Sequence, residues 1–79
     1  MGRIDKIINK MRNNPRDWRI EDLKTVANRL GVVYRQPGTS HVTFRTQGGR
    51  QLTVPARKPI KPIYIKKFVE LIDTMGDEV

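Results

Sequence analysis

The chain contains no cysteine and only one histidine, His41. Disulfide bonds, thiolate metal sites and zinc sites with several histidines are therefore excluded. No apolar run approaches the roughly 20 residues that a membrane helix needs. The charged N-terminal segment also lacks the apolar centre of a signal peptide. We therefore expect a cytoplasmic protein that has no membrane partner.

Acidic side chains are missing from the middle of the chain, since no Asp or Glu lies between Asp22 and Glu70. The formal net charge is +8, and many of the basic residues fall in this acid-free stretch. A field of one sign attracts polyanions, and nucleic acid phosphate is the obvious partner. A two-metal nuclease needs clustered carboxylates, so we expect no metal and no small-molecule cofactor. The plainer alternative is that the charge only keeps the chain in solution.

The 79 residues suggest a single small domain, residues 1–79. A domain of this size buries only roughly 60% of its unfolded surface. It has no room for a deep cavity between two domains. Any chemistry is therefore expected on a surface groove or on the face of a sheet.

Apolar residues at helical spacing predict helices at residues 3–12, about 18–30 and about 63–74. Asp17 could cap the second helix, and Gly31 could end it. Between the second and third of these helices, apolar and polar residues alternate with a period of two. This alternation predicts three strands, at residues 32–36, about 39–46 and 50–54.

Turn residues separate the expected strands: Pro37-Gly38 suits a tight turn, and Gly48-Gly49 suits a hairpin. The alternation places Val42 and Phe44 on one face of the sheet and His41 on the other. We therefore predict an α+β fold, with a three-stranded antiparallel sheet covered on one face by helices and an extra N-terminal helix. Double-stranded-RNA-binding domains have this α-β-β-β-α core.

A metal-free ribonuclease needs a base for the ribose 2′-hydroxyl and cations for the phosphate. His41 is the candidate base, because histidine changes protonation closest to neutral pH. Arg45 shares its expected face, and Ser40 could hold the phosphate or steady the turn. His41 and Ser40 also have ordinary alternatives, as a surface histidine and a turn serine.

Prolines stiffen the basic connection between the third strand and the last helix, residues 55–62. Stiffly held cations lose less entropy when they bind a ligand. We expect phosphate contacts from this segment, although a solvated loop is the common alternative. Together with the preceding strands, the expected RNA contacts are Gly38, Ser40, Arg45, Arg57, Lys58 and Lys61.

One ordered set of motifs resembles the HicA toxin family. It starts with Trp18 to Leu23 and continues with the Gly38-Thr39-Ser40-His41 run. After the glycine hairpin come Leu52-Thr53-Val54-Pro55 and a Lys-Pro-Ile-Lys-Pro loop. The resemblance covers residues 18–74 as a HicA-like core, and it departs from many members at Thr39 and Val42. Residues 1–14 form a helical extension that either packs on the core or extends a partner interface.

The resemblance implies a toxin of a type II toxin–antitoxin system with a fold like that of double-stranded-RNA-binding domains. Such toxins are endoribonucleases that cleave mRNA, and His41 occupies the position of their catalytic histidine. A HicB-like antitoxin protein neutralises them by covering the active-site surface. Two alternatives stay open from the sequence: a non-catalytic RNA-binding module on the same basic surface, and an interaction protein for an acidic partner.

Overall fold

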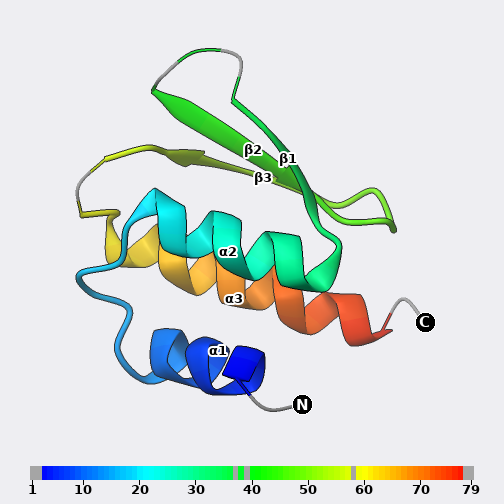
Figure 1. Ribbon diagram of the computed structural model, residues 1–79, viewed down its shortest axis with the longest axis horizontal. Coiled ribbons are helices and arrows are strands. Elements are labelled where there is room, and N and C mark those ends of the chain that lie inside the picture. Colours follow the sequence, from blue (N-terminus) through cyan, green and yellow to red (C-terminus); the bar gives the residue numbers. More distant parts are fainter. Residues whose placement is uncertain (1–2, 37, 39, 58, 78–79) are drawn as a thin grey trace.

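The computed structural model describes residues 3–36, 38, 40–57 and 59–77, with residues 3–5 and 75–77 described by their backbone alone. Three helices and three strands follow the predicted order along the chain (Figure 1). The elements are α1 (Arg3–Asn13), α2 (Ile20–Leu30), β1 (Val33–Arg35), β2 (His41–Arg45), β3 (Gln51–Pro55) and α3 (Pro62–Asp77).

The three strands form one antiparallel sheet in the order β1-β2-β3, so β2 is central. On its inner face, Phe44 lies opposite Tyr34 on one side and Leu52 on the other. Val42 lies opposite Val54, and both side chains are buried. The strand alternation predicted from the sequence is confirmed, because the buried residues of β2 are the ones expected inside.

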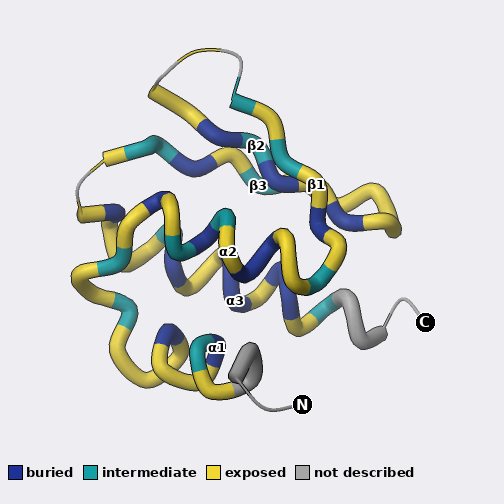
Figure 2. The backbone as a smooth tube through the Cα atoms, viewed as in Figure 1, coloured by how far each residue is buried: buried dark blue, intermediate teal, exposed yellow. Residues whose placement is uncertain are grey.

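The helices form two layers beneath the sheet (Figure 1). α2 and α3 cover its inner face, while α1 lies on the far side of these two helices and contacts both. In the part of the chain that the structure describes, no helix covers the outer face of the sheet (Figure 1). Figure 2 shows that the buried positions of α2 and α3 lie between the layers, while exposed positions follow the outside. The α+β arrangement predicted from the sequence, with a double-stranded-RNA-binding-like core, is therefore present.

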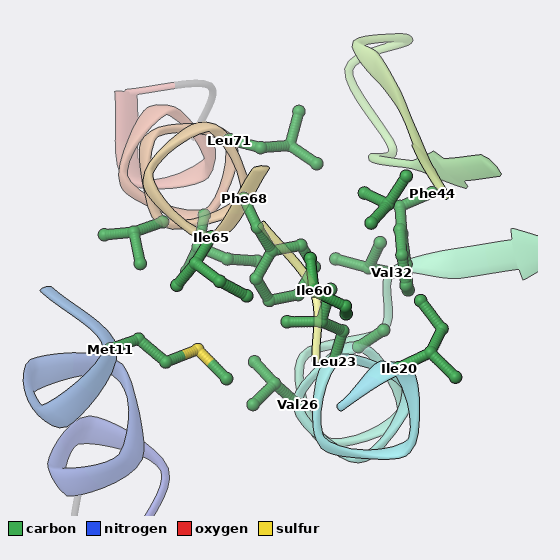
Figure 3. Packing of buried hydrophobic residues seen from close by; sticks show 14 of the residues in the cluster. Met11, Ile20, Leu23, Val26, Val32, Phe44, Ile60, Ile65, Phe68 and Leu71 are labelled. Carbon is green, nitrogen blue, oxygen red and sulfur yellow. The ribbon is translucent and has the colours of Figure 1, made fainter. Parts of the chain in front are cut away.

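Aromatic side chains link the sheet to α3: the rings of Phe44 and Phe68 meet nearly edge to face, with centroids 5.1 Å apart. Such contacts add to the stabilisation that burial gives. Met11 of α1 is 0% exposed and points toward α2 and α3, near Val26 and Ile65 (Figure 3). The N-terminal extension is therefore part of the hydrophobic core.

The start of α2 differs from the prediction. The helix begins at Ile20 rather than Trp18, and Asp17 is not its cap. Asp17 has a positive φ of 65°, which turns the chain before the helix. The cap position is Arg19, whose backbone N–H donates to the Asp22 carboxylate at 3.0 Å. At the other end, Gly31 has a φ of 75° and ends the helix as predicted.

No helix in the part of the chain that the structure describes is both long and apolar enough to cross a membrane.

Candidate functional site

The outer face of the sheet is polar and basic. Its described residues come from all three strands, because antiparallel partners point to the same face. β2 contributes His41, Thr43 and Arg45, of which His41 and Arg45 are exposed. The register adds neighbours on both sides: Val33, Arg35, Gln51, Thr53 and Pro55.

His41 is the first residue of β2, and its ring has a partner in the preceding residue. Its Nδ1 atom lies 3.2 Å from the Ser40 hydroxyl oxygen. Among the described residues, no partner contacts the other ring nitrogen, Nε2. When Nδ1 donates its proton to Ser40, Nε2 carries the lone pair and can accept a proton. The pair therefore presents a nitrogen base to solvent.

Backbone contacts fix the end of the sheet where this pair lies. His41 is the register partner of Pro55, and the N–H of Ala56 donates to the Ser40 carbonyl at 2.8 Å. The N–H of Arg57 then donates to the Pro55 carbonyl at 2.9 Å, which bends the chain directly after β3. The start of β2, the end of β3 and the start of α3 consequently lie at the same end of the molecule (Figure 1).

A small hollow opens at this end, with a volume of about 90 Å³. Its walls are Pro55, Arg57, Lys61 and Tyr64. Pro55 belongs to both features, since it also lies opposite His41 in the sheet. Two of the predicted phosphate contacts, Arg57 and Lys61, are thus brought together one strand away from the histidine.

The buried side chain of Ile60 holds the loop in front of α3. It is 1% exposed, and its N–H donates to the Trp18 carbonyl at 2.9 Å. Lys61 follows directly, and its carbonyl accepts the N–H of Tyr64 at 3.0 Å in the first turn of α3. The cation and the phenol are therefore attached to backbone that is fixed at both ends.

Arg45 lies on the predicted face but far along the strand from His41. Four residues of extended chain separate their Cα atoms by about 13 Å. Arg35 is closer, because it pairs with Thr43 and is a diagonal neighbour of His41. Diagonal neighbours in a sheet lie about 7–8 Å apart, within reach of an arginine side chain. Arg35 therefore joins the site, and Arg45 extends it.

The centre of the outer face carries a pair of hydroxyl groups. Thr43 and Thr53 are cross-strand partners whose hydroxyl oxygens lie 3.0 Å apart. Together with Gln51, they give the face neutral groups that can donate or accept hydrogen bonds. The surface between the cations can thus contact ribose and phosphate oxygens.

The electrostatics of this face follow from the sequence, because no Asp or Glu lies between Asp22 and Glu70. All three strands and their connections fall within that stretch. Within the described residues, no group of three or more histidine or carboxylate side chains could hold a metal ion. The charged groups of the site are therefore cations only.

A larger hollow of about 280 Å³ lies between the other end of β3 and α3. Its described walls include Gln51, which pairs with Arg45, and three charged residues: Arg50, Lys67 and Glu70. It is remote from His41, and Glu70 would repel a phosphate. Among the described walls of the smaller hollow beside Pro55, both ionised side chains are basic, so this hollow is the better candidate for anion binding.

Other predicted contacts lie at the rim of the site or outside the described residues. Gly38 is exposed, and a side chain added there would meet nothing within 4 Å. Lys58 and the predicted turn residue Pro37 lie outside the described residues, as does Thr39 of the Gly-x-Ser-His run. The roles of the placed residues remain predictions, whereas their positions are now known.

Two residues of the site were not among the sequence candidates, Arg35 and Tyr64. Arg35 could have been found by pairing the predicted first two strands, since the hairpin brings it toward His41. Tyr64 gives no comparable signal. Its place in the hollow depends on how the proline-rich loop returns to α3.

Comparison with models of protein families, with curated sequences and with solved structures found no match to this chain.

Proposed function

We propose that this protein is an endoribonuclease toxin of the HicA type, which cleaves mRNA with His41 as its catalytic residue. The observation that supports this function most directly is the position of His41. Its ring is exposed and hydrogen-bonded to Ser40, and it lies on a sheet face whose charged side chains are all basic. An exposed base among cations matches the needs of RNA cleavage.

The reaction needs few groups, because RNA carries its own nucleophile. The His41 imidazole takes the proton of a ribose 2′-hydroxyl, and the 2′-oxygen forms a bond to the adjacent phosphorus. The bond from phosphorus to the 5′-oxygen breaks, and this oxygen takes a proton from water or from the imidazolium. The products are a 2′,3′-cyclic phosphate and a free 5′-hydroxyl.

Arginine and lysine stabilise the negative charge that grows on the phosphate oxygens during this step. Register brings Arg35 toward His41, and the loop after β3 places Arg57 and Lys61 in the hollow beside its partner Pro55. Arg45 would contact the RNA further along the strand. This assignment requires no metal ion and no small-molecule cofactor.

The biological setting follows from the same proposal. A nuclease that attacks mRNA acts in the cytoplasm and must be restrained. We expect a HicB-like antitoxin protein that covers the His41 face, since blocking this surface would prevent RNA from reaching the base.

The test is cleavage of mRNA by purified wild-type protein and by His41→Ala, with and without EDTA. We expect the substitution to leave the fold intact, because His41 is exposed and outside the core. It should abolish both cleavage and growth arrest, whereas EDTA should leave wild-type cleavage unchanged. Full activity of the variant would end the proposal. RNA binding without any cleavage by the wild type would favour a non-catalytic RNA-binding module instead.

A further inference from the structure

The hollow at the end of β3 is lined by basic, phenolic and apolar side chains. Arg57 and Lys61 are exposed cations, Tyr64 is a half-buried phenol, and Pro55 closes the side toward the sheet. Among the described residues, none forms a hydrogen bond or ion pair with the side chains of Arg57, Lys61 or Tyr64. Their donor groups are therefore available to a ligand.

The size of the hollow limits what that ligand can be. Pockets that enclose whole drug-sized molecules have volumes of about 300–1,000 Å³. At about 90 Å³, this hollow admits a small group rather than a nucleoside. A guanidinium, an ammonium and a phenolic O–H are all donors, and two of them are positively charged. A phosphate group fits both the size and the chemistry.

The setting of the hollow adds to its positive potential. It lies where α3 begins, and the first turn of α3 carries no acidic residue to offset the positive end of the helix dipole. The nearest strand, β3, carries no acidic residue either. Both cations extend from a loop whose backbone is tied to Pro55 and Trp18.

The distance to the histidine identifies which phosphate would be bound. Pro55 is the register partner of His41, so one wall of the hollow lies about 5 Å from the start of the catalytic strand. An RNA strand whose scissile phosphate lies at His41 would place its neighbouring phosphate close to this hollow. His41 is not among the described walls of the hollow, whose far wall, Tyr64, belongs to α3 rather than to the sheet.

We propose that Arg57, Lys61 and Tyr64 form a subsite for the phosphate next to the scissile one. This inference rests on the proposed nuclease function and adds a substrate requirement to it. The preferred substrate is an RNA with a phosphate flanking the cleaved bond on the side of the hollow. Because the subsite holds a phosphate, it imposes no choice of base at that position.

The test compares the dinucleotide UpU, which has only the scissile phosphate, with pUpU and UpUp, which add one terminal phosphate. For the wild type, we expect kcat/KM to rise about tenfold or more with one of these additions, because hydrogen bonds to charged groups are stronger than neutral ones. The ratio of kcat/KM for the substrate with the added phosphate to kcat/KM for UpU should fall toward one in Arg57→Gln and Lys61→Gln. In Tyr64→Phe it should fall less, because only an uncharged donor is lost.

Lys66→Gln is the matched control. It removes one charge from an exposed lysine of α3 that does not line the hollow, and it should keep the wild-type ratio. A ratio of one for both additions in the wild type would overturn the subsite. So would a wild-type ratio in both Arg57→Gln and Lys61→Gln.

A binding measurement separates failure of the subsite from failure of the nuclease proposal. Calorimetric titration with uridine 3′,5′-bisphosphate and with uridine 3′-monophosphate does not depend on cleavage. We expect the second phosphate to lower Kd about tenfold in the wild type, and this gain to disappear in Arg57→Gln. If no dinucleotide is cleaved but this gain is observed, the nuclease proposal fails and the phosphate site stands. Equal affinities for the two nucleotides would contradict the phosphate site.

Discussion

At the scale of single residues, the exposed His41 ring depends on its neighbour for its orientation. The Ser40 hydroxyl oxygen lies 3.2 Å from Nδ1 and is its partner in the described part of the chain. An exposed side chain without such a contact would sample several rotamers. The hydrogen bond therefore favours one ring orientation and leaves Nε2 without a partner among the described residues.

Replacing Ser40 tests this role. A neutral hydrogen bond contributes ~1 kcal/mol, so we expect Ser40→Ala to reduce kcat/KM for RNA about fivefold. Ser40→Thr keeps the hydroxyl and should stay closer to the wild type. Single-turnover cleavage assays on both variants measure the effect. An unchanged rate for Ser40→Ala would mean that the ring needs no support from this hydroxyl.

The sequence predicts on which face of the sheet a side chain lies, because the alternation of residues along one strand determines this. Val42 and Phe44 are buried in β2, so His41 must lie on the opposite face. The alternation within one strand does not predict how strands pair in register or where a loop returns to the next helix. Arg35 approaches His41 only because β1 pairs with β2 in one particular register, and Tyr64 joins the site through the return of a loop. Both depend on contacts between segments distant in the sequence.

At the scale of secondary structure, α1 is held to the rest of the protein mainly by burial. Met11 is 0% exposed and packs against α2 and α3 (Figure 3). Beside it, the exposed Arg12 donates to Asp73 of α3 at 2.6 Å. Burial of apolar surface contributes far more than an exposed ion pair does.

These two neighbouring residues give a matched comparison. Met11→Ala should lower the free energy of unfolding by ~2–5 kcal/mol, because it leaves a cavity in the core. Arg12→Ala should lower it by less than ~1 kcal/mol, since both partners are half exposed. Urea denaturation of the two variants measures both values. Equal, small losses would show that α1 is only loosely attached.

The element boundaries show where sequence patterns are less reliable. The helix predicted at about residues 18–30 is present, and Ile20, Leu23, Val26 and Ala27 are its buried residues, but it starts two residues later than expected. Asp17 is a good cap by residue type, yet the chain turns there with a positive φ, and Asp22 bonds the Arg19 backbone instead. The Ile60 N–H also donates to the carbonyl of Trp18, just before the helix, and this tertiary contact is not visible in the local sequence.

At the scale of the whole molecule, the helices are confined to one side of the sheet and leave the other face to solvent (Figure 1). The acid-free stretch between Asp22 and Glu70 contains every strand, so the open face and its adjoining loop are basic together. The basic character of the open face could be predicted from the sequence, because the stretch without acidic residues coincides with the predicted strands. Under the proposed function, this basic face would attract RNA independently of any catalytic step.

The salt dependence of RNA binding tests whether the basic face contacts RNA phosphates. Each phosphate neutralised on a single strand contributes roughly −0.7 to the slope of log K against log salt. With contacts from Arg35, Arg45, Arg57 and Lys61, we expect a slope of about −3 for single-stranded RNA. Arg35→Gln should make it shallower by roughly 0.7. Fluorescence anisotropy across a salt series measures both slopes, and affinity that does not change with salt would contradict a phosphate-directed surface.

In the proposed reaction, His41 activates a ribose 2′-hydroxyl. The most direct measurement follows one RNA cleavage site in two otherwise identical oligonucleotides, one of which has a 2′-deoxyribose at the cleaved position. We predict that the wild type cuts only the all-ribose strand, leaving a 2′,3′-cyclic phosphate, and that His41→Ala cuts neither. Equal cleavage of the 2′-deoxy strand, or a fully active His41→Ala variant, would contradict the claim.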